Sequence, residues 1–274
     1  IRYVPTFDES VASIKGTSIN DLKQFHKEFY GTNHASVSVV GDFDQASVQK
    51  IVSDEFGSWK SEQPFTRIGS PYINVSAEKK NFETPDKANA MFVAGMNMPI
   101  QDTDPDYPAL VMANYMLGGG FLNSRLANRI RQKDGLSYGV GSQLNASSLD
   151  KNGTFLSYAI FAPQNAEKLE VAFKEEIEKV GKEGFTLEEI KAAKSGYLQS
   201  RQVNRAQDAS LTSMLGNNLY LNRSMNWEAD FDKKIQSLSP EQIKSAFAKY
   251  INYNQLTIIK AGEFNKKTTA VEPG

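Results

Sequence analysis

Residues 116–142 read MLGGGFLNSRLANRIRQKDGLSYGVGS, and their pattern indicates the end of one helix, a three-glycine turn, a short helix, a tight turn and the start of a strand. Leu122, Leu126 and Ile130 recur every four residues, which predicts one apolar stripe along the short helix. Three arginines flank this stripe. The short helix is therefore predicted to be amphipathic and cationic.

A turn and a strand follow this helix. Asp134-Gly135 is a turn dipeptide, and residues 136–141 then alternate large and small side chains, the period-two pattern of a strand. Arg131 and Tyr138 thus lie on either side of one turn. Composition alone favours a surface arginine and a half-buried sheet tyrosine. Together, however, a guanidinium and a phenol in fixed relation can hydrogen-bond a carbonyl oxygen, either of a bound peptide or of its developing oxyanion.

The composition is that of an ordinary globular protein. With 274 residues, 40% hydrophobic and 23% charged, the chain is long enough for two domains or one large one. Its net charge is -1 and its basic residues are dispersed, so we expect no nucleic-acid partner. The absence of cysteine excludes disulfides and thiolate metal sites. No apolar run has the length of a membrane span, and the first residue, Ile1, indicates an upstream segment outside this sequence.

The order of the predicted elements favours an α+β fold. Pairs of strands are followed by pairs of helices, which predicts an antiparallel sheet with helices packed on one face. The predicted strands are 34–41, 73–82, 88–96, 136–142, 154–162 and 255–261. The predicted helices are 19–30, 44–56, 103–118, 122–133, 164–182, 186–222, 227–236 and 240–250. Ser18 is the predicted cap of the first, Thr103 or Asp104 that of the third, and Thr186 that of the sixth.

An internal repeat organises the chain. Residues 18–43 align without a gap with residues 239–264, so that the same helix, Asn turn and strand occur twice. Shared propensity of two helix–strand units is the alternative explanation. The identical pairs are Ser18/Ser239, Lys23/Lys244, Asn33/Asn254, Gly41/Gly262 and Phe43/Phe264. If both copies close the same fold, roughly 150 residues of the first domain lie outside this sequence.

The repeat gives a domain plan. Residues 1–59 are the predicted C-terminal remnant of a first domain, and residues 60–71, rich in Gly, Ser, Pro and charge, are a linker. Residues 72–266 form a complete second domain, and residues 267–274 are a tail.

The residues exclude most catalytic chemistry within this chain. Its two histidines, His26 and His34, have neither the helical spacing of a zinc protease nor that of a zinc finger. No Gly-x-Ser-x-Gly elbow occurs, and the chain has no cysteine nucleophile. Gly118, Gly119 and Gly120 lack the Gly-Lys-Ser/Thr ending of a phosphate loop, so we interpret them as a helix C-cap followed by close backbone approach.

These residues carry a family resemblance. The segment GGGFLNSRLANRIRQKDGLSYGV is similar to the second-half signature of the inverzincin zinc peptidases, the pitrilysin and mitochondrial processing peptidase family, particularly its bacterial members. The segment FHKEFYGTNHASVSVVGDFD resembles the one that closes the first homologous domain of that family. FAKYINYNQLTIIKAGEF resembles its counterpart in the second domain. The resemblance extends from about residue 17 to residue 264.

The resemblance implies that the two domains of such a protein have different roles. In that family one domain binds zinc through H-x-x-E-H plus a further Glu, while the other encloses unfolded peptide and supplies an Arg and a Tyr seven residues apart. Arg131 and Tyr138 match this pair and are the implied substrate-binding residues, with Gly118, Gly119 and Gly120 as the supporting loop. No H-x-x-E-H occurs here. The family places this motif in the first domain, in the part that the repeat argument puts outside this sequence. The resemblance therefore implies that residues 1–59 are the remnant of a metal-type domain.

Expectations for activity and partners follow from the resemblance. The chain is expected to contain no catalytic residue, to bind no metal and to be inactive alone, with zinc in a missing or partner catalytic domain. The expected partners are that domain, in the same polypeptide or a separate subunit, and an unfolded peptide. The alternatives are a catalytically inert scaffold subunit of the same fold, or an isolated peptide-binding module. The implied location is the bacterial periplasm or cytoplasm, with the periplasm preferred.

Overall fold

The computed structural model describes residues 3–85, 87–120 and 123–265. The chain forms two compact units. Unit 1 comprises residues 1–68 and 207–222, and unit 2 comprises residues 69–206 and 223–274. The domain boundaries expected at residues 59 and 72 stay a prediction.

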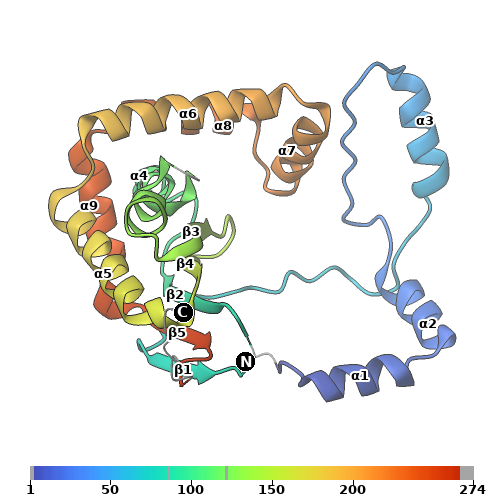
Figure 1. The fold of residues 1–274 in the computed structure, drawn as a ribbon. Helices are drawn as coiled ribbons and strands as arrows, with labels where there is room; N and C mark the ends of the chain where they lie inside the picture. The colour runs from blue at the N-terminus through green and yellow to red at the C-terminus, as the bar shows by residue number, and fades with distance from the viewer. Residues whose placement is uncertain (1–2, 86, 121–122, 266–274) are drawn as a thin grey trace, which may run out of the picture. The chain divides into compact units, whose positions relative to one another are not determined.

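Unit 2 is built on one five-stranded sheet with the order β1-β5-β2-β4-β3 (Figure 1). Neighbouring strands are antiparallel, except that β1 and β5 run parallel. The strands are β1 Lys79–Glu83, β2 Ala90–Met98, β3 Ser137–Ala146, β4 Gly153–Phe161 and β5 Thr257–Gly262. The α+β class expected from the sequence is confirmed.

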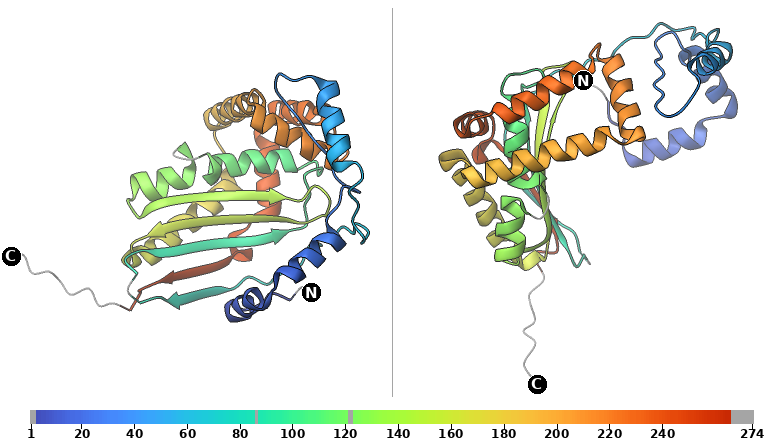
Figure 2. Two further views of the ribbon diagram at one scale, coloured as in Figure 1. Left: turned by 90° about the vertical axis from the view of Figure 1, so that its right-hand side faces the viewer. Right: turned by 90° about the horizontal axis from the view of Figure 1, so that it is seen from above.

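Helices cover one face of this sheet (Figure 2). Along β4, Phe155, Ala159 and Phe161 are buried in the core, whereas the alternating Leu156 and Ile160 are exposed. The helical elements are α4 Tyr107–Asn114, η1 Tyr115–Gly119, η3 Ala127–Lys133, η4 Pro163–Asn165, α5 Ala166–Glu183, α6 Leu187–Arg205, α8 Met225–Ser237, α9 Pro240–Tyr250 and η5 Tyr253–Gln255. The opposite face of the sheet stays open, and apolar side chains of β2 and β4 lie on it.

Two helix boundaries differ from the sequence-based prediction. The helix expected to be capped by Thr103 or Asp104 begins at Tyr107, after Asp106. The Asp104 carboxylate instead accepts a hydrogen bond of 2.8 Å from the backbone N–H of Gln101, so it stabilises the preceding turn. The single helix expected over 186–222 is interrupted at residues 206–207, and its second part, α7 Asp208–Tyr220, belongs to unit 1.

Unit 1 contains α1 Phe7–Gly16, α2 Ile19–Phe29 and α3 Gln45–Phe56 in addition to α7. The predicted cap Ser18 is confirmed, because its side chain accepts a hydrogen bond from the N–H of Asp21. The sequence prediction missed α1, although Thr6 and Glu9 form a capping box at its start. None of α1, α2 and α3 contains a buried residue.

The strand predicted over 34–41 is wrong for this chain, because residues 35–40 have no regular secondary structure. A strand exists only where a neighbouring strand completes its hydrogen bonds. The repeat copy, β5, has two such neighbours, β1 and β2. Residues 35–40 have the β propensity without a partner strand, so they form an extended but irregular segment.

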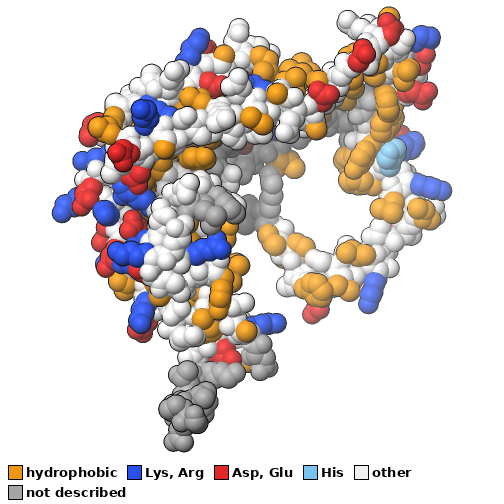
Figure 3. Space-filling view, turned by 45° about the horizontal axis from the view of Figure 1, so that its top comes forward, with side chains coloured by type: hydrophobic (Ala, Val, Ile, Leu, Met, Phe, Trp, Pro, Cys, Tyr) orange, Lys and Arg blue, Asp and Glu red, His pale blue; other side chains and the backbone are white. Residues whose placement is uncertain are grey.

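Matching apolar side chains in the two copies of the repeat differ in burial. Leu22 is 55% exposed, whereas its counterpart Ile243 is 0% exposed. Val37 is 55% exposed, whereas its counterpart Ile258 is 1% exposed. Figure 3 shows hydrophobic side chains open at the surface of unit 1. The first copy therefore presents to solvent the face that the second copy buries in a core.

A half-buried carboxylate joins the sheet of unit 2 to α5. Glu170 accepts hydrogen bonds of 2.7 Å from Lys260 and 2.9 Å from each of Lys79 and Tyr253. Burial by itself raises the pKa of Glu170, but these hydrogen bonds outweigh it and lower the pKa to about 2. The charged form is thus favoured in the folded state.

We expect Glu170→Gln to lower the free energy of unfolding at pH 7 by at most about 3 kcal/mol. Because the folded pKa is depressed, this stability is present above the unfolded pKa of about 4.3 and is lost as the pH falls towards 2. Urea unfolding of the wild type and the variant between pH 7 and pH 2 measures it. The exposed Glu167→Gln on the same helix is the control, and a difference that does not change with pH contradicts the assignment.

Candidate functional site

The three-glycine segment lies against β3. Helix α4 continues through the π-helical turn η1, and Gly118 in that turn packs directly on Ser142. A Cβ atom at Gly118 would lie 2.6 Å from the backbone nitrogen of Ser142, so only glycine permits this approach. Ser142 in turn donates a hydrogen bond of 2.8 Å to the Asn114 side chain. The close backbone approach expected here is confirmed, and Gly120 is the C-cap residue of η1.

A cavity of about 270 Å³ opens beside this contact. Its walls come from η1, η3, β3 and β4, which are all elements of unit 2. Ten residues line it: Gly118, Gly119, Ala127, Arg131, Gly139, Val140, Gly141, Ser142, Gln143 and Tyr158. We call it the glycine pocket. Of the expected site residues, Arg131, Gly118 and Gly119 line this pocket, whereas Gly120 and Tyr138 do not.

Arg131 is exposed on η3, and the buried inner face of η3 holds this helix against the core. Leu126 and Ile130 are buried as the apolar stripe predicts, and Leu122 lies outside the described residues. Arg125, on the same basic segment, forms two hydrogen bonds with Glu189. Arg131 has no ion pair or hydrogen bond with any residue that the structure describes. Its guanidinium is therefore available to a ligand.

Tyr138 occupies a β-bulge. Ser137 pairs with Phe161 and Gly139 pairs with Ile160, so Tyr138 is an extra residue with no partner across the ladder. The simple alternation expected over 136–141 is therefore wrong at this point. The bulge turns the Tyr138 side chain outward, and it is 64% exposed. Bulges are frequent next to binding sites because they redirect one side chain.

Sequence reasoning missed Tyr158. It faces Gly141 across the β3–β4 ladder, and a Cβ atom at Gly141 would lie 3.3 Å from the phenol oxygen. The sequence contains only part of the information needed to find Tyr158. The alternation in β3 predicts glycines on one face of the strand, but it does not give the register that pairs Tyr158 with Gly141.

The described part of the chain contains no group of three histidine, aspartate or glutamate side chains that could hold a metal ion. His26 stacks on Tyr30 and Trp59, with ring centroids 5.1 and 5.4 Å apart, and His34 packs against Phe65. Both histidines thus have structural partners within unit 1, and the residues described do not fit a zinc site.

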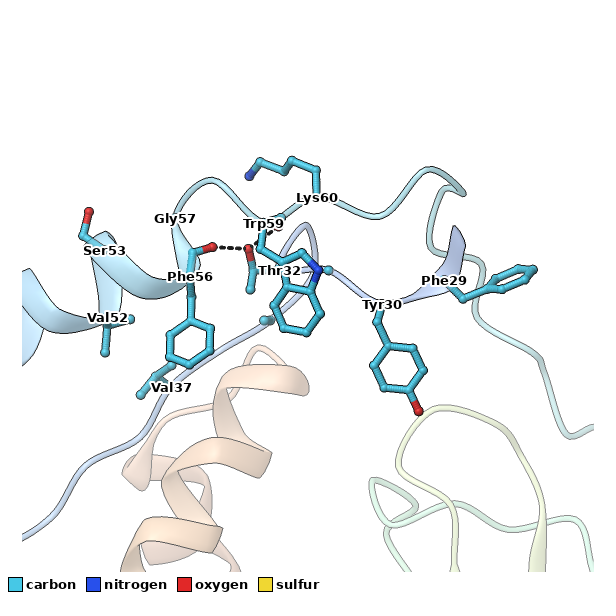
Figure 4. Close-up of a pocket in the computed structure, with 12 residues that line it drawn as sticks. Phe29, Tyr30, Thr32, Val37, Val52, Ser53, Phe56, Gly57, Trp59 and Lys60 are labelled. Carbon is cyan, nitrogen blue, oxygen red and sulfur yellow. Dashed lines mark hydrogen bonds between the residues drawn. The ribbon is translucent and has the colours of Figure 1, made fainter. Parts of the chain in front are cut away.

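Unit 1 has a larger, apolar cavity of about 680 Å³ (Figure 4). The Thr32 hydroxyl oxygen lies 2.7 Å from the carbonyl oxygens of both Phe56 and Trp59, and its one O–H is shared between these two acceptors. The side chains of Phe56, Trp59 and Tyr30 lie on one side of the chain in Figure 4. This cavity, which we call the unit 1 pocket, contains no carboxylate and only one charged lining residue, Lys60.

Unit 2 is thus an α+β domain with a cationic pocket beside a glycine-rich turn. Among the helices described, none is both long and apolar enough to cross a membrane. The family model "Peptidase M16 inactive domain" matches residues 17–197. The chain therefore belongs to the Peptidase M16 inactive domain family, which confirms the resemblance carried by the glycine, arginine and tyrosine motif.

Known relatives agree with this assignment. The "Non-peptidase homolog YmxG" of Helicobacter pylori is 26% identical over 256 residues, covering 91% of this chain and 56% of the relative. The "Uncharacterized zinc protease YmxG" of Bacillus subtilis is 24% identical over 211 residues, covering 77% and 49% respectively. A crystal structure described as a peptidase M16 inactive domain from Pseudomonas fluorescens has a TM-score of 0.79 at 25% identity, covering 92% of this chain and 58% of that one. The chain spans about half the length of these curated relatives.

Proposed function

We propose that this chain is the substrate-binding half of a zinc-dependent peptidase. In this role unit 2 encloses an unfolded peptide, and Arg131 and Tyr138 contact its backbone. A separate zinc-binding half, in the same polypeptide or another subunit, carries H-x-x-E-H and supplies the hydrolytic chemistry. The observation that carries the proposal is the exposed Arg131, which has no partner among the described residues, beside a glycine-lined cavity, with Tyr138 turned outward by a bulge in β3 at the edge of the sheet.

The chemistry of the two side chains supports this role. A guanidinium has five N–H donors and no acceptor, and a phenol can donate one hydrogen bond. Both groups suit a carbonyl oxygen, and they suit it better when negative charge develops on that oxygen. Neither Arg131 nor Tyr138 has a partner among the described residues that would have to be displaced. A bound peptide therefore costs no internal hydrogen bond at this site.

Unit 1 supports the proposed partner. Its helices carry exposed Leu22, Phe25 and Ile51, and residues 35–40 lack a neighbouring strand. Soluble proteins rarely expose contiguous apolar surface of this kind without a partner. In the second copy of the repeat, the counterparts of Leu22 and Phe25 are Ile243 and Ala246, and both are buried in the core. We therefore propose that the zinc-binding half covers unit 1 and pairs a strand with residues 36–40.

A second candidate function is an inert scaffold or interaction subunit of the same fold. The name of the Helicobacter pylori relative, "Non-peptidase homolog", favours it. In that role the apolar surface of unit 1 would still bind a partner, but the glycine pocket would bind no peptide.

Mixing this chain with the zinc-binding half of the enzyme distinguishes the two functions. We expect cleavage of a fluorogenic unfolded peptide to require both halves, because the substrate contacts and the metal are on different halves. The zinc content of the zinc-binding half is measured in parallel as the control. Equal cleavage with and without this chain contradicts the substrate-binding role and favours the scaffold.

A further inference from the structure

The glycine pocket contains a phenol that the proposed function does not use. Tyr158 lies in β4 opposite Gly141, and both line the pocket with Arg131. A Cβ atom at Gly141 would lie 3.3 Å from both the Tyr158 hydroxyl and the carbonyl oxygen of Gly118, so the absence of a side chain at Gly141 leaves room for the phenol. The structure gives the Tyr158 hydroxyl no hydrogen-bond partner among the residues it describes. The pocket thus presents two unused donors, the guanidinium and the phenol.

The side chains that line the glycine pocket carry positive charge and no negative charge. Its ten lining residues include Arg131 and no aspartate or glutamate. Within the described part of unit 2, Arg131 differs from the other arginines, each of which forms an ion pair with a carboxylate. These pairs are Arg125–Glu189, Arg129–Glu175, Arg201–Asp232, Arg205–Asp232 and Arg223–Asp102. Arg131 alone in that set is left without a counter-ion, and it faces a cavity.

We propose that the glycine pocket binds a carboxylate of the unfolded peptide, held by an ion pair to Arg131 and a hydrogen bond from Tyr158. The carboxylate is either an Asp or Glu side chain or the C-terminus of the peptide. This inference rests on the proposed function, because it names the class of peptide that the same site accepts. Arg131 has enough N–H donors to bind this carboxylate and a neighbouring backbone carbonyl together.

The size of the pocket limits the ligand. Its volume of about 270 Å³ is below the range of about 300–1,000 Å³ that accommodates drug-sized ligands. It therefore has room for one short side chain or a chain terminus. Gln143 is the remaining lining residue with a polar side chain and no hydrogen bond to the described residues, and its amide can contact either kind of carboxylate.

Binding of labelled peptides to the full 274-residue chain tests the proposal. The probes are fluorescein-labelled unfolded peptides of one length, with either Glu or Gln at one central position, each made with a free or an amidated C-terminus. Fluorescence anisotropy at low and high salt gives the dissociation constants. We expect a carboxylate to strengthen binding about tenfold at low salt and less at high salt, because the Arg131 pair is exposed to solvent. The Glu/Gln and acid/amide comparisons identify which carboxylate is bound.

Matched variants locate the effect. Arg131→Gln should abolish the preference for the carboxylate, and Tyr158→Phe should reduce it while keeping the ring in place. Lys133→Gln removes the same charge from an exposed position on η3 outside the pocket, and we expect it to keep the preference. Equal binding of all four peptides, or an equal loss in Lys133→Gln and Arg131→Gln, overturns the carboxylate pocket and leaves the proposed function intact. The absence of any peptide binding overturns the proposed function itself, and the pocket proposal with it.

Discussion

Replacing Ile243 with alanine is expected to lower the free energy of unfolding of unit 2 by about 2–5 kcal/mol, whereas Leu22→Ala should change that of unit 1 by about 0.5 kcal/mol or less. The two residues occupy the same position of the internal repeat. Ile243 is fully buried in the core, so its truncation removes apolar contacts and leaves a cavity. Leu22 is exposed and has few contacts to lose in this chain.

The tryptophans allow each unit to be followed separately. The chain has two, Trp59 in unit 1 and Trp227 in unit 2. Urea unfolding of Ile243→Ala in a Trp59→Phe background reports unit 2, and Leu22→Ala in a Trp227→Phe background reports unit 1. Equal losses for the two substitutions would contradict the account, because Leu22 would then already be covered within this chain.

Leu22→Ala should become costly only when the zinc-binding half is present. Full burial of a leucine side chain contributes about 1.5–3 kcal/mol, which corresponds to about a 10- to 100-fold change in a dissociation constant. The affinity of the zinc-binding half for the wild type and for Leu22→Ala, measured by calorimetry, checks this step. The matched control is Lys23→Ala, which truncates an exposed polar side chain on the same helix. If Leu22→Ala weakens binding no more than Lys23→Ala does, the zinc-binding half does not cover Leu22.

Arg131→Ala in the complete peptidase should lower kcat/KM by about 10- to 100-fold. A hydrogen bond from a charged donor contributes about 1.5–3 kcal/mol, and each 1.36 kcal/mol is about a factor of ten in rate. Steady-state cleavage of an unfolded peptide measures the effect. A fall in kcat indicates contact with the developing oxyanion, and a rise in KM alone indicates contact with the ground-state carbonyl.

The control for Arg131→Ala is Lys133→Ala, which removes a neighbouring charge outside the pocket. The Arg131 side chain is exposed and has no partner among the described residues, so its loss should leave the unfolding free energy nearly unchanged. An unchanged kcat/KM with an intact zinc content would refute the role of Arg131.

The sequence predicted those features that depend on local chemistry. The predicted capping residues Ser18 and Thr186 each begin a helix in the structure, because a side-chain cap satisfies backbone N–H groups within one turn. The strand over 34–41 failed because a strand depends on a neighbour that no local pattern reveals. Its apolar residues Val37 and Val39 were expected to be buried, but they are exposed in this chain.

The candidate site was also predictable only in part, because some of its features depend on local chemistry and others on tertiary structure. Arg131 and the close approach at Gly118 follow from the motif and its glycines, and both are found at one pocket. The bulge at Tyr138 and the position of Tyr158 depend on the register between β3 and β4. Register is a tertiary property, since a shift of one residue reverses every side chain of a strand. The outward direction of Tyr138 therefore required the structure.

Hydrogen exchange of the backbone amides of residues 36–40 tests the central claim most directly, namely that the zinc-binding half completes the first copy of the fold. In this chain alone these amides should exchange fast, because the segment has no neighbouring strand, while the amides of β5 are protected. When the zinc-binding half is added, we predict that residues 36–40 become protected to an extent similar to β5. Fast exchange of residues 36–40 within a complex that has demonstrably formed would contradict the account.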